Sequence, residues 1–142
     1  MADIDFKKLS VLVVDDEPFM RSLIKRLLVE LEITKVSEAA DGDEALRKVK
    51  EVEGALDLII CDLEMPKMDG IEFVKRLREL TGFPNASIPV LIVTGHSEAE
   101  SVKEAVQAGI HGYLVKPVSK AALEKRIVAA MTSPLIDPQK LK

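Results

Sequence analysis

Apolar and polar positions along the chain follow two patterns that alternate. Short apolar runs of the kind that form buried strands lie at 9–14, 58–61, 88–93 and 113–115, and a weaker strand pattern lies at 33–39. Between them, apolar residues recur every three or four positions, which predicts amphipathic helices. Helix-starting residues precede these stretches, at Pro18, Asp41, Asp69, Ser97 and Ser119. Five strand–helix repeats predict an α/β fold with a doubly wound parallel sheet and helices on both faces.

The pattern predicts one domain over residues 9–131. The chain has 142 residues, 47% of them hydrophobic, which is enough for one full core. Residues 1–8 are a polar lead-in. Residues 132–142 contain two prolines and no periodic pattern, and we expect them to be a tail or the stump of a linker.

Composition argues against several classes of function. The chain has 20 Lys and Arg against 24 Asp and Glu, a net charge of −4, which does not favour a nucleic-acid surface. No apolar stretch approaches the roughly 20 residues of a membrane span, and the N-terminus lacks an apolar signal-peptide core. The single cysteine, Cys61, lies in a buried run and cannot form an internal disulfide. We therefore expect a cytoplasmic protein.

Polar side chains follow four of the five predicted strands. Asp15 and Asp16 come after the first strand, Asp62 after the third, Thr94 after the fourth and Lys116 after the fifth. Each residue alone is more often a helix cap or a loop residue than part of a site. In a parallel sheet, however, all carboxyl ends lie at one edge. We therefore expect these five side chains to converge.

Such a set suits phosphoryl transfer. Three close carboxylates repel one another, and a hard divalent cation such as Mg²⁺ relieves that repulsion. A lysine and a threonine can contact phosphate oxygens, and a carboxylate can accept a phosphoryl group covalently. The sequence contains neither a Walker A loop nor a Gly-x-Gly-x-x-Gly turn, so the phosphoryl donor must be another molecule.

Four motifs surround these positions: VVDDEP at 13–18, CDLEMPKMDG at 61–70, VTG at 93–95 and GYLVKP at 112–117. Together they resemble the receiver domain of bacterial two-component response regulators, in particular single-domain chemotaxis-type receivers. The resemblance covers about residues 9–131. It implies a flavodoxin-like (βα)5 fold with strand order 2-1-3-4-5.

The resemblance assigns a phosphoacceptor and a metal site. It implies that Asp62 accepts a phosphoryl group from a histidine kinase or a histidine phosphotransfer protein. It implies that Asp15, Asp16, Asp62 and the backbone carbonyl of Glu64 hold Mg²⁺, with Mn²⁺ able to substitute. It also implies a cis peptide bond between Lys116 and Pro117.

The resemblance further implies a two-state switch. Lys116 would pair with the phosphoacceptor and then with the phosphoryl group, Thr94 would contact a phosphoryl oxygen, and Gly95 would keep access open. Tyr113 would be the aromatic switch residue. The change would reach a downstream protein target through the face formed by residues 97–131, with no direct nucleic-acid contact and no membrane insertion.

Two further polar residues flank the expected entrance to the site. Glu64 lies two positions after the phosphoacceptor, and His96 lies two positions after Thr94. Solvated loop residues would account for them equally well. Our hypothesis is that they tune the lifetime of the phosphorylated state.

Other functions remain as alternatives. A Mg²⁺-dependent phosphatase or mutase that forms an aspartyl phosphate would explain the spacing of Asp62 and Glu64, but its nucleophile usually follows the first strand. An FMN-binding flavodoxin-like module would need a phosphate loop where this chain has Asp15 and Asp16. A degenerate scaffold receiver is disfavoured because all five site residues are present. We expect a signalling domain, not an enzyme beyond its own phosphotransfer and slow autodephosphorylation, as a stand-alone protein or as a fragment of a larger regulator or hybrid kinase.

Overall fold

The computed structural model describes residues 4–51, 56–81, 87–95 and 99–132. Five parallel strands form one sheet in the order β2-β1-β3-β4-β5, which confirms the predicted doubly wound fold and its strand order. The strands are β1 (Ser10–Val14), β2 (Lys35–Ala39), β3 (Leu58–Asp62), β4 (Val90–Thr94) and β5 (Gly112–Val115).

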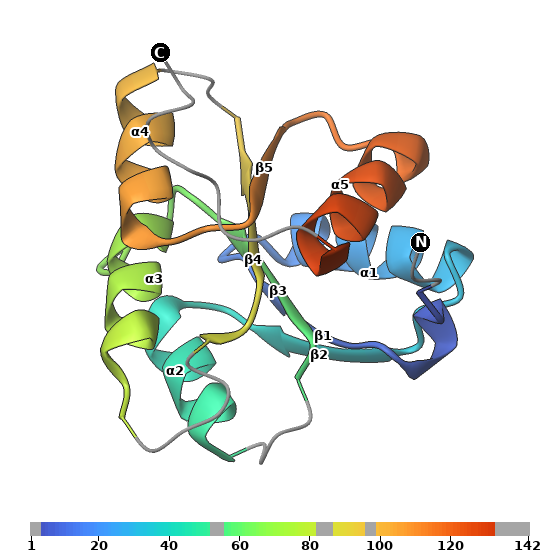
Figure 1. Cartoon of the computed structure of the whole chain (residues 1–142), viewed down its shortest axis with the longest axis horizontal. Helices are drawn as coiled ribbons and strands as arrows, with labels where there is room; N and C mark the ends of the chain where they lie inside the picture. Colours follow the sequence, from blue (N-terminus) through green and yellow to red (C-terminus); the bar gives the residue numbers. More distant parts are fainter. Residues whose placement is uncertain (1–3, 52–55, 82–86, 96–98, 133–142) are drawn as a thin grey trace.

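Helices cover both faces of the sheet (Figure 1). Two helices, α1 (Pro18–Glu30) and α5 (Lys120–Thr132), pack on one face. Three helices pack on the other: α2 (Gly42–Glu51), α3 (Gly70–Glu79) and α4 (Ala99–Ala108). The lead-in contains a short 3-10 helix that the sequence pattern did not predict, η1 (Phe6–Lys8), capped by the side chain of Asp5.

Successive residues of each central strand pack alternately into two separate hydrophobic cores, one on each face of the sheet. In β1, Leu12 and Val14 pack beneath α2, α3 and α4, whereas Val11 and Val13 pack beneath α1 and α5. The strands β3 and β4 alternate in the same way and are buried along their whole length. Because both faces are covered, these strands are continuously apolar, which is the pattern that predicted them.

The predicted helix starts hold where the structure describes them. The side chains of Asp41 and Asp69 each accept a hydrogen bond of 2.8 Å from the backbone N–H three residues ahead. The hydroxyl of Ser119 accepts one of 3.1 Å from the N–H of Ala122. Gly109 ends α4 with a φ of +104°, as expected of a C-terminal cap. The predicted cap Ser97 lies outside the described residues.

Two strands start two residues later than the apolar pattern predicts. The strand predicted from residue 33 begins at Lys35, because Glu32 has a positive φ of 70° and turns the chain just before Ile33. The strand predicted from residue 88 begins at Val90, because Pro89 has no N–H to donate, although its carbonyl accepts from Ile59. Both shifts leave the carboxyl ends of the strands, where the expected site lies, unchanged.

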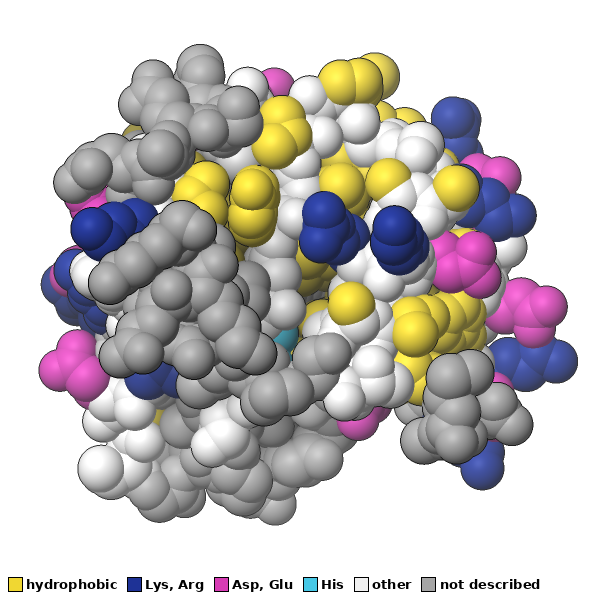
Figure 2. Space-filling model, turned by 45° about the horizontal axis from the view of Figure 1, so that its top comes forward, with side chains coloured by type: hydrophobic (Ala, Val, Ile, Leu, Met, Phe, Trp, Pro, Cys, Tyr) yellow, Lys and Arg dark blue, Asp and Glu magenta, His cyan; other side chains and the backbone are white. Residues whose placement is uncertain are grey.

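The surface carries charge of both signs. On the face in Figure 2, lysine and arginine side chains lie scattered among acidic and apolar ones rather than in one continuous field. Among the described residues, no helix has the length and apolar character needed to cross a membrane.

Candidate functional site

Three carboxylates meet at the carboxyl edge of the sheet. The strand register pairs Val14 of β1 with Cys61 of β3, so the next residues, Asp15 and Asp62, lie side by side. Oxygen atoms of Asp15, Asp16 and Asp62 all lie within 4.8 Å of one another. Asp15 and Asp62 are buried and Asp16 is half-buried. The structure thus brings together the three acids that the sequence placed at this edge.

Lys116 supplies the positive charge of this cluster. Its Nζ lies 3.5 Å from Oδ1 of Asp62 and 3.9 Å from Oδ2 of Asp15. Its backbone N–H donates to the carbonyl of Thr94 at 2.8 Å, which fixes the point where the chain leaves β5. One ammonium among three carboxylates leaves the cluster with a net negative charge when all are ionised.

Burial opposes this concentration of charge. Burial, and then the charge of Asp15, raise the pKa of Asp62 to about 6, although Lys116 and a hydrogen bond from the backbone of Glu64 act in the opposite direction. The pKa of Asp15 is also raised, again chiefly by burial. Both carboxylates therefore lack part of the charge compensation that their ionised forms need.

The donor set fits a hard divalent cation. Oδ2 of Asp15 is buried and accepts no hydrogen bond within the described part of the chain. Buried polar atoms are rarely left in that state. Three carboxylates with one such oxygen match the ligand preference of Mg²⁺, which binds through oxygen atoms and few protein carboxylates.

The other predicted site residues take different places. Thr94 is buried and directly follows Val93, the register partner of Asp62, so it lies at the same edge. Gly95 is exposed, and a Cβ atom there would meet no atom within 4 Å. Tyr113 lies further back in β5, half-buried against the core on the α4 side, and not in the carboxylate cluster. His96 lies outside the described residues.

The loop after Asp62 is tightly constrained. The N–H of Met68 donates to the carbonyl of Pro66 at 2.8 Å across Lys67, whose φ is +69°, and this forms a γ-turn. The N–H of Gly70 donates to the carbonyl of Leu63 at 2.8 Å. A Cβ on Gly70 would lie 2.5 Å from the carbonyl oxygen of Asp62, so only glycine fits there. On the far side of the site, the Lys116–Pro117 peptide bond is cis.

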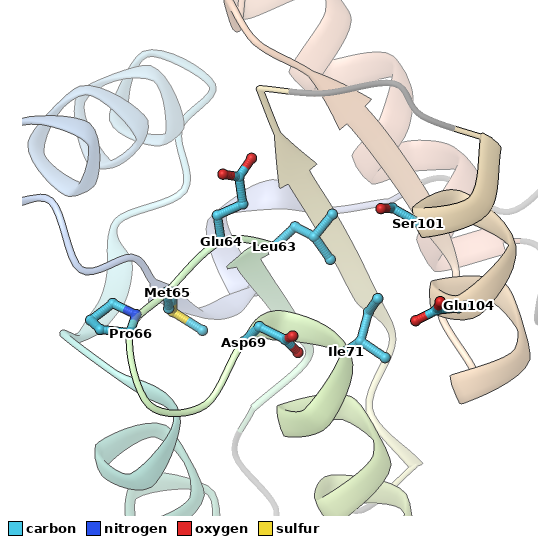
Figure 3. Close-up of a pocket in the computed structure, with 8 residues that line it drawn as sticks. All are labelled: Leu63, Glu64, Met65, Pro66, Asp69, Ile71, Ser101 and Glu104. Carbon is cyan, nitrogen blue, oxygen red and sulfur yellow. The ribbon is translucent and has the colours of Figure 1, made fainter.

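A cleft of about 640 Å³ lies beside the cluster, whose three carboxylates are not among its lining residues. The loop after Asp62 and the start of α3 form one wall, and α4 forms the other (Figure 3). A partner bound in this cleft would touch the residues next to Asp62 and the helix α4 at once. Its lining residues are Leu63, Glu64, Met65, Pro66, Asp69, Ile71, Ser101 and Glu104.

One residue that contacts the cluster was not predicted from the sequence to take part in the site. Arg21 of α1 donates from Nη1 to the backbone carbonyl of Asp15 at 2.6 Å. Its helical position was predictable, but an arginine on an amphipathic helix is ordinarily a solvated surface residue. No motif in the sequence indicated that its side chain reaches the backbone of a site residue.

Comparison with known proteins agrees with the fold. The family model of the response regulator receiver domain matches residues 11–128. Chemotaxis protein CheY-3 of Vibrio cholerae is 37% identical over 121 residues, which cover 85% of this chain and 90% of that protein.

Solved structures give the same picture. Chemotaxis protein CheY4 of Vibrio cholerae superposes with a TM-score of 0.77 and 34% identity, over 86% of this chain and 98% of that one. The CheY of a CheX–CheY–BeF3–Mg²⁺ complex from Borrelia burgdorferi gives a TM-score of 0.80 and 26% identity, over 88% and 90%. The sheet order, the carboxylate cluster and these matches lead to one conclusion: the chain belongs to the family of response regulator receiver domains, the signalling domains of two-component systems.

Proposed function

We propose that this receiver domain is switched by phosphorylation of Asp62. The donor would be the phosphohistidine of a histidine kinase or of a histidine phosphotransfer protein. The observation that carries the proposal is the cluster itself, in which Asp62 ends a central strand between two further carboxylates and the Lys116 ammonium. Among the described residues, Asp15, Asp16 and Asp62 form the group of side chains that lie close enough together to share a metal ion.

Asp15, Asp16 and Asp62 would hold Mg²⁺, with the backbone carbonyl of Glu64 as a further ligand and Mn²⁺ able to substitute. When bound, the ion supplies positive charge that offsets the carboxylates and the phosphoryl oxygens. The CheY structure from Borrelia burgdorferi is described as a complex with Mg²⁺ and BeF3, which supports a metal in this family's site.

The chemistry on the chain's side is a displacement at phosphorus. A carboxylate oxygen of Asp62 bonds to phosphorus, the phosphorus–nitrogen bond of phosphohistidine breaks, and its electron pair stays on the imidazole. Asp62 reacts as the carboxylate, and a pKa of about 6 leaves it largely ionised at neutral pH. Lys116, whose Nζ lies 3.5 Å from Oδ1 of Asp62, would pair with the added phosphoryl oxygens.

The phosphoryl group would then bias a two-state switch. Thr94 lies next to the register partner of Asp62 and would move to a phosphoryl oxygen, and Tyr113 would change its rotamer in response. A downstream protein target would recognise the altered face formed by residues 97–131. A protein named CheX is the partner in the Borrelia complex, which supports a protein rather than a nucleic acid as the reader.

Intact mass spectrometry after incubation with Mg²⁺ and acetyl phosphate tests this function. The wild type should gain the mass of one phosphoryl group, and Asp62→Asn should gain none. Asp57→Asn is the matched control, since Asp57 lies just before the other end of β3 and its side chain accepts from the N–H of Ser10. That variant should be phosphorylated like the wild type.

Two outcomes would contradict the proposal. A folded wild-type sample that gains no mass would favour a scaffold, and steady hydrolysis of unrelated phosphate esters would favour a phosphatase.

The lifetime of the phosphorylated form has its own test. We expect Glu64→Ala and His96→Ala each to change the dephosphorylation rate, and unchanged rates would dismiss these residues as tuning positions.

A further inference from the structure

Asp15 is held at three of its four polar atoms. Its N–H donates to the carbonyl of Ala39 at 3.1 Å, and its Oδ1 accepts from the N–H of Glu17 at 2.9 Å. Its backbone carbonyl accepts from Nη1 of Arg21 at 2.6 Å. The fourth atom, Oδ2, accepts no hydrogen bond from the described residues and lies 3.9 Å from Lys116. Oδ2 is therefore the atom of Asp15 that is available to coordinate a cation.

Arg21 is itself held in place. Its Nε lies 3.4 Å from one carboxylate oxygen of Glu38, and only 18% of its side chain is exposed. The other oxygen of Glu38 lies 3.6 Å from the ammonium of Lys25, and the carbonyl of Glu38 accepts from the side chain of Lys48. The contact on Asp15 is thus the end of a network that joins α1, β2 and α2.

We propose that Arg21 is a positioning residue that sets the Mg²⁺ affinity of the cluster by fixing the backbone of Asp15. This inference rests on the proposed metal site. With its backbone and Oδ1 fixed, Asp15 can present Oδ2 at little further cost in ordering. Groups that orient metal ligands in this way typically change metal affinity by about 10–100-fold when they are removed.

The charge of Arg21 disfavours Mg²⁺ binding, whereas its contact with the backbone of Asp15 favours binding. The direction in which the dissociation constant changes can therefore test the inference. A guanidinium near a cation site repels the cation, so its removal should tighten binding if Arg21 acts only through its charge. If Arg21 acts by holding Asp15, its removal should weaken binding. The direction of the change in dissociation constant distinguishes the two.

The experiment is isothermal titration of the full chain with MgCl₂, with circular dichroism to confirm that each variant is folded. Arg21→Gln should raise the dissociation constant about tenfold or more. Arg21→Lys should fall between Arg21→Gln and the wild type, because lysine keeps the charge but lacks the planar fork of donors. Lys25→Gln is the matched control. It removes a charge that faces the same Glu38, and its dissociation constant should stay within about twofold of the wild type or fall.

Each other result counts against the inference. An unchanged or tighter dissociation constant in Arg21→Gln overturns it, as does equal weakening in Lys25→Gln. If Arg21→Gln does not fold, Arg21→Lys decides, and a wild-type dissociation constant in that variant overturns it. A wild type that binds no Mg²⁺ would instead overturn the proposed metal site, and the inference with it.

Discussion

The charge on Asp62 destabilises the metal-free protein. Burial raises the pKa of this carboxyl from 3.8 to about 6. Between these pH values the folded state holds the proton more readily than the unfolded state does. The free energy of unfolding therefore falls as pH rises through this window. The full cost above pH 6 is about 3 kcal/mol, from about 1.4 kcal/mol for each pKa unit.

Asp62→Asn should accordingly stabilise the protein at pH 7 in the presence of EDTA. The amide keeps the shape of the side chain and removes the charge, so we expect a gain of up to about 3 kcal/mol in urea unfolding. The gain should shrink as pH falls from 7 to 4, where the wild-type carboxyl is also neutral. Asp57→Asn should show no such gain, and a gain independent of pH would mean that its cause is not the charge.

The site residues fall into two groups by how far the sequence could predict them. Asp15, Asp62 and Lys116 follow apolar runs, so knowing where strands end was enough to bring them together. Arg21 could not be found in this way. Its partner is a backbone carbonyl, which carries no sequence signal, and the contact depends on how α1 is placed against the end of β1.

At the scale of elements, the connection from β3 to α3 is the most constrained part of the site. The backbone of α3 approaches the end of β3 so closely that a Cβ on Gly70 would meet the carbonyl oxygen of Asp62 at 2.5 Å and Cα of Leu63 at 3.0 Å. Both neighbours are backbone atoms and cannot rotate away. Any larger residue must therefore displace the start of the helix or the end of the strand.

Gly70→Ala should destabilise the protein by about 1–3 kcal/mol, the usual cost of overpacking. Gly95→Ala is the matched control, because a Cβ there meets nothing within 4 Å, and it should unfold within about 0.5 kcal/mol of the wild type. Urea unfolding of the two variants provides the comparison. Equal stabilities would show that the β3–α3 connection yields without cost.

Elements were more predictable than their boundaries. The three central strands follow from continuous apolar runs because they are buried on both faces, whereas β2 lies at an edge of the sheet, is only partly buried and has a weaker apolar pattern. The start of β4 depends on the missing N–H of Pro89, and the start of β2 depends on the left-handed turn at Glu32, which is not a glycine. The helix η1 has too few residues to show any period.

At the scale of the whole molecule, a second polar cluster lies at the opposite end of the sheet. Arg78 of α3 donates to the carbonyls of Ile88, before β4, and of Gly109, before β5, with distances of 2.7 Å to each. His111 is adjacent, and its Nδ1 accepts from the N–H of Val90 at 3.3 Å. These contacts join α3, β4 and the α4–β5 connection where no site residue lies.

His111 should make the protein less stable in mild acid. Burial, and then the charge of Arg78, lower the pKa of this imidazole below its ordinary 6.5. The unfolded state therefore takes up the proton first as pH falls below 6.5, and the free energy of unfolding decreases. In the Asp62→Asn background, which removes the opposite slope that Asp62 contributes, adding His111→Asn should flatten the loss between pH 7 and 5.5. An equally steep loss would assign it to another group.

The two ends of the sheet should be energetically independent in the metal-free protein. Burial lowers the pKa of Arg78 to about 10, so it is still charged at neutral pH, and lysine cannot reproduce its fork of donors. Arg78→Lys should cost about 1–3 kcal/mol, because it leaves buried carbonyls underpaired. A five-residue strand spans about 17 Å, beyond the range at which substitutions usually couple.

The double variant Asp62→Asn, Arg78→Lys tests this independence. Its change in unfolding free energy should equal the sum of the two single changes to within about 0.5 kcal/mol. Repeating this double-mutant cycle with saturating Mg²⁺ measures whether the ion couples the two ends of the sheet. In the metal-free protein, a discrepancy above about 1 kcal/mol would mean that charge at Asp62 already strains the α3–β4 contacts. Additivity would instead confine the cost of that charge to the carboxyl edge, where Lys116 and a bound cation can offset it.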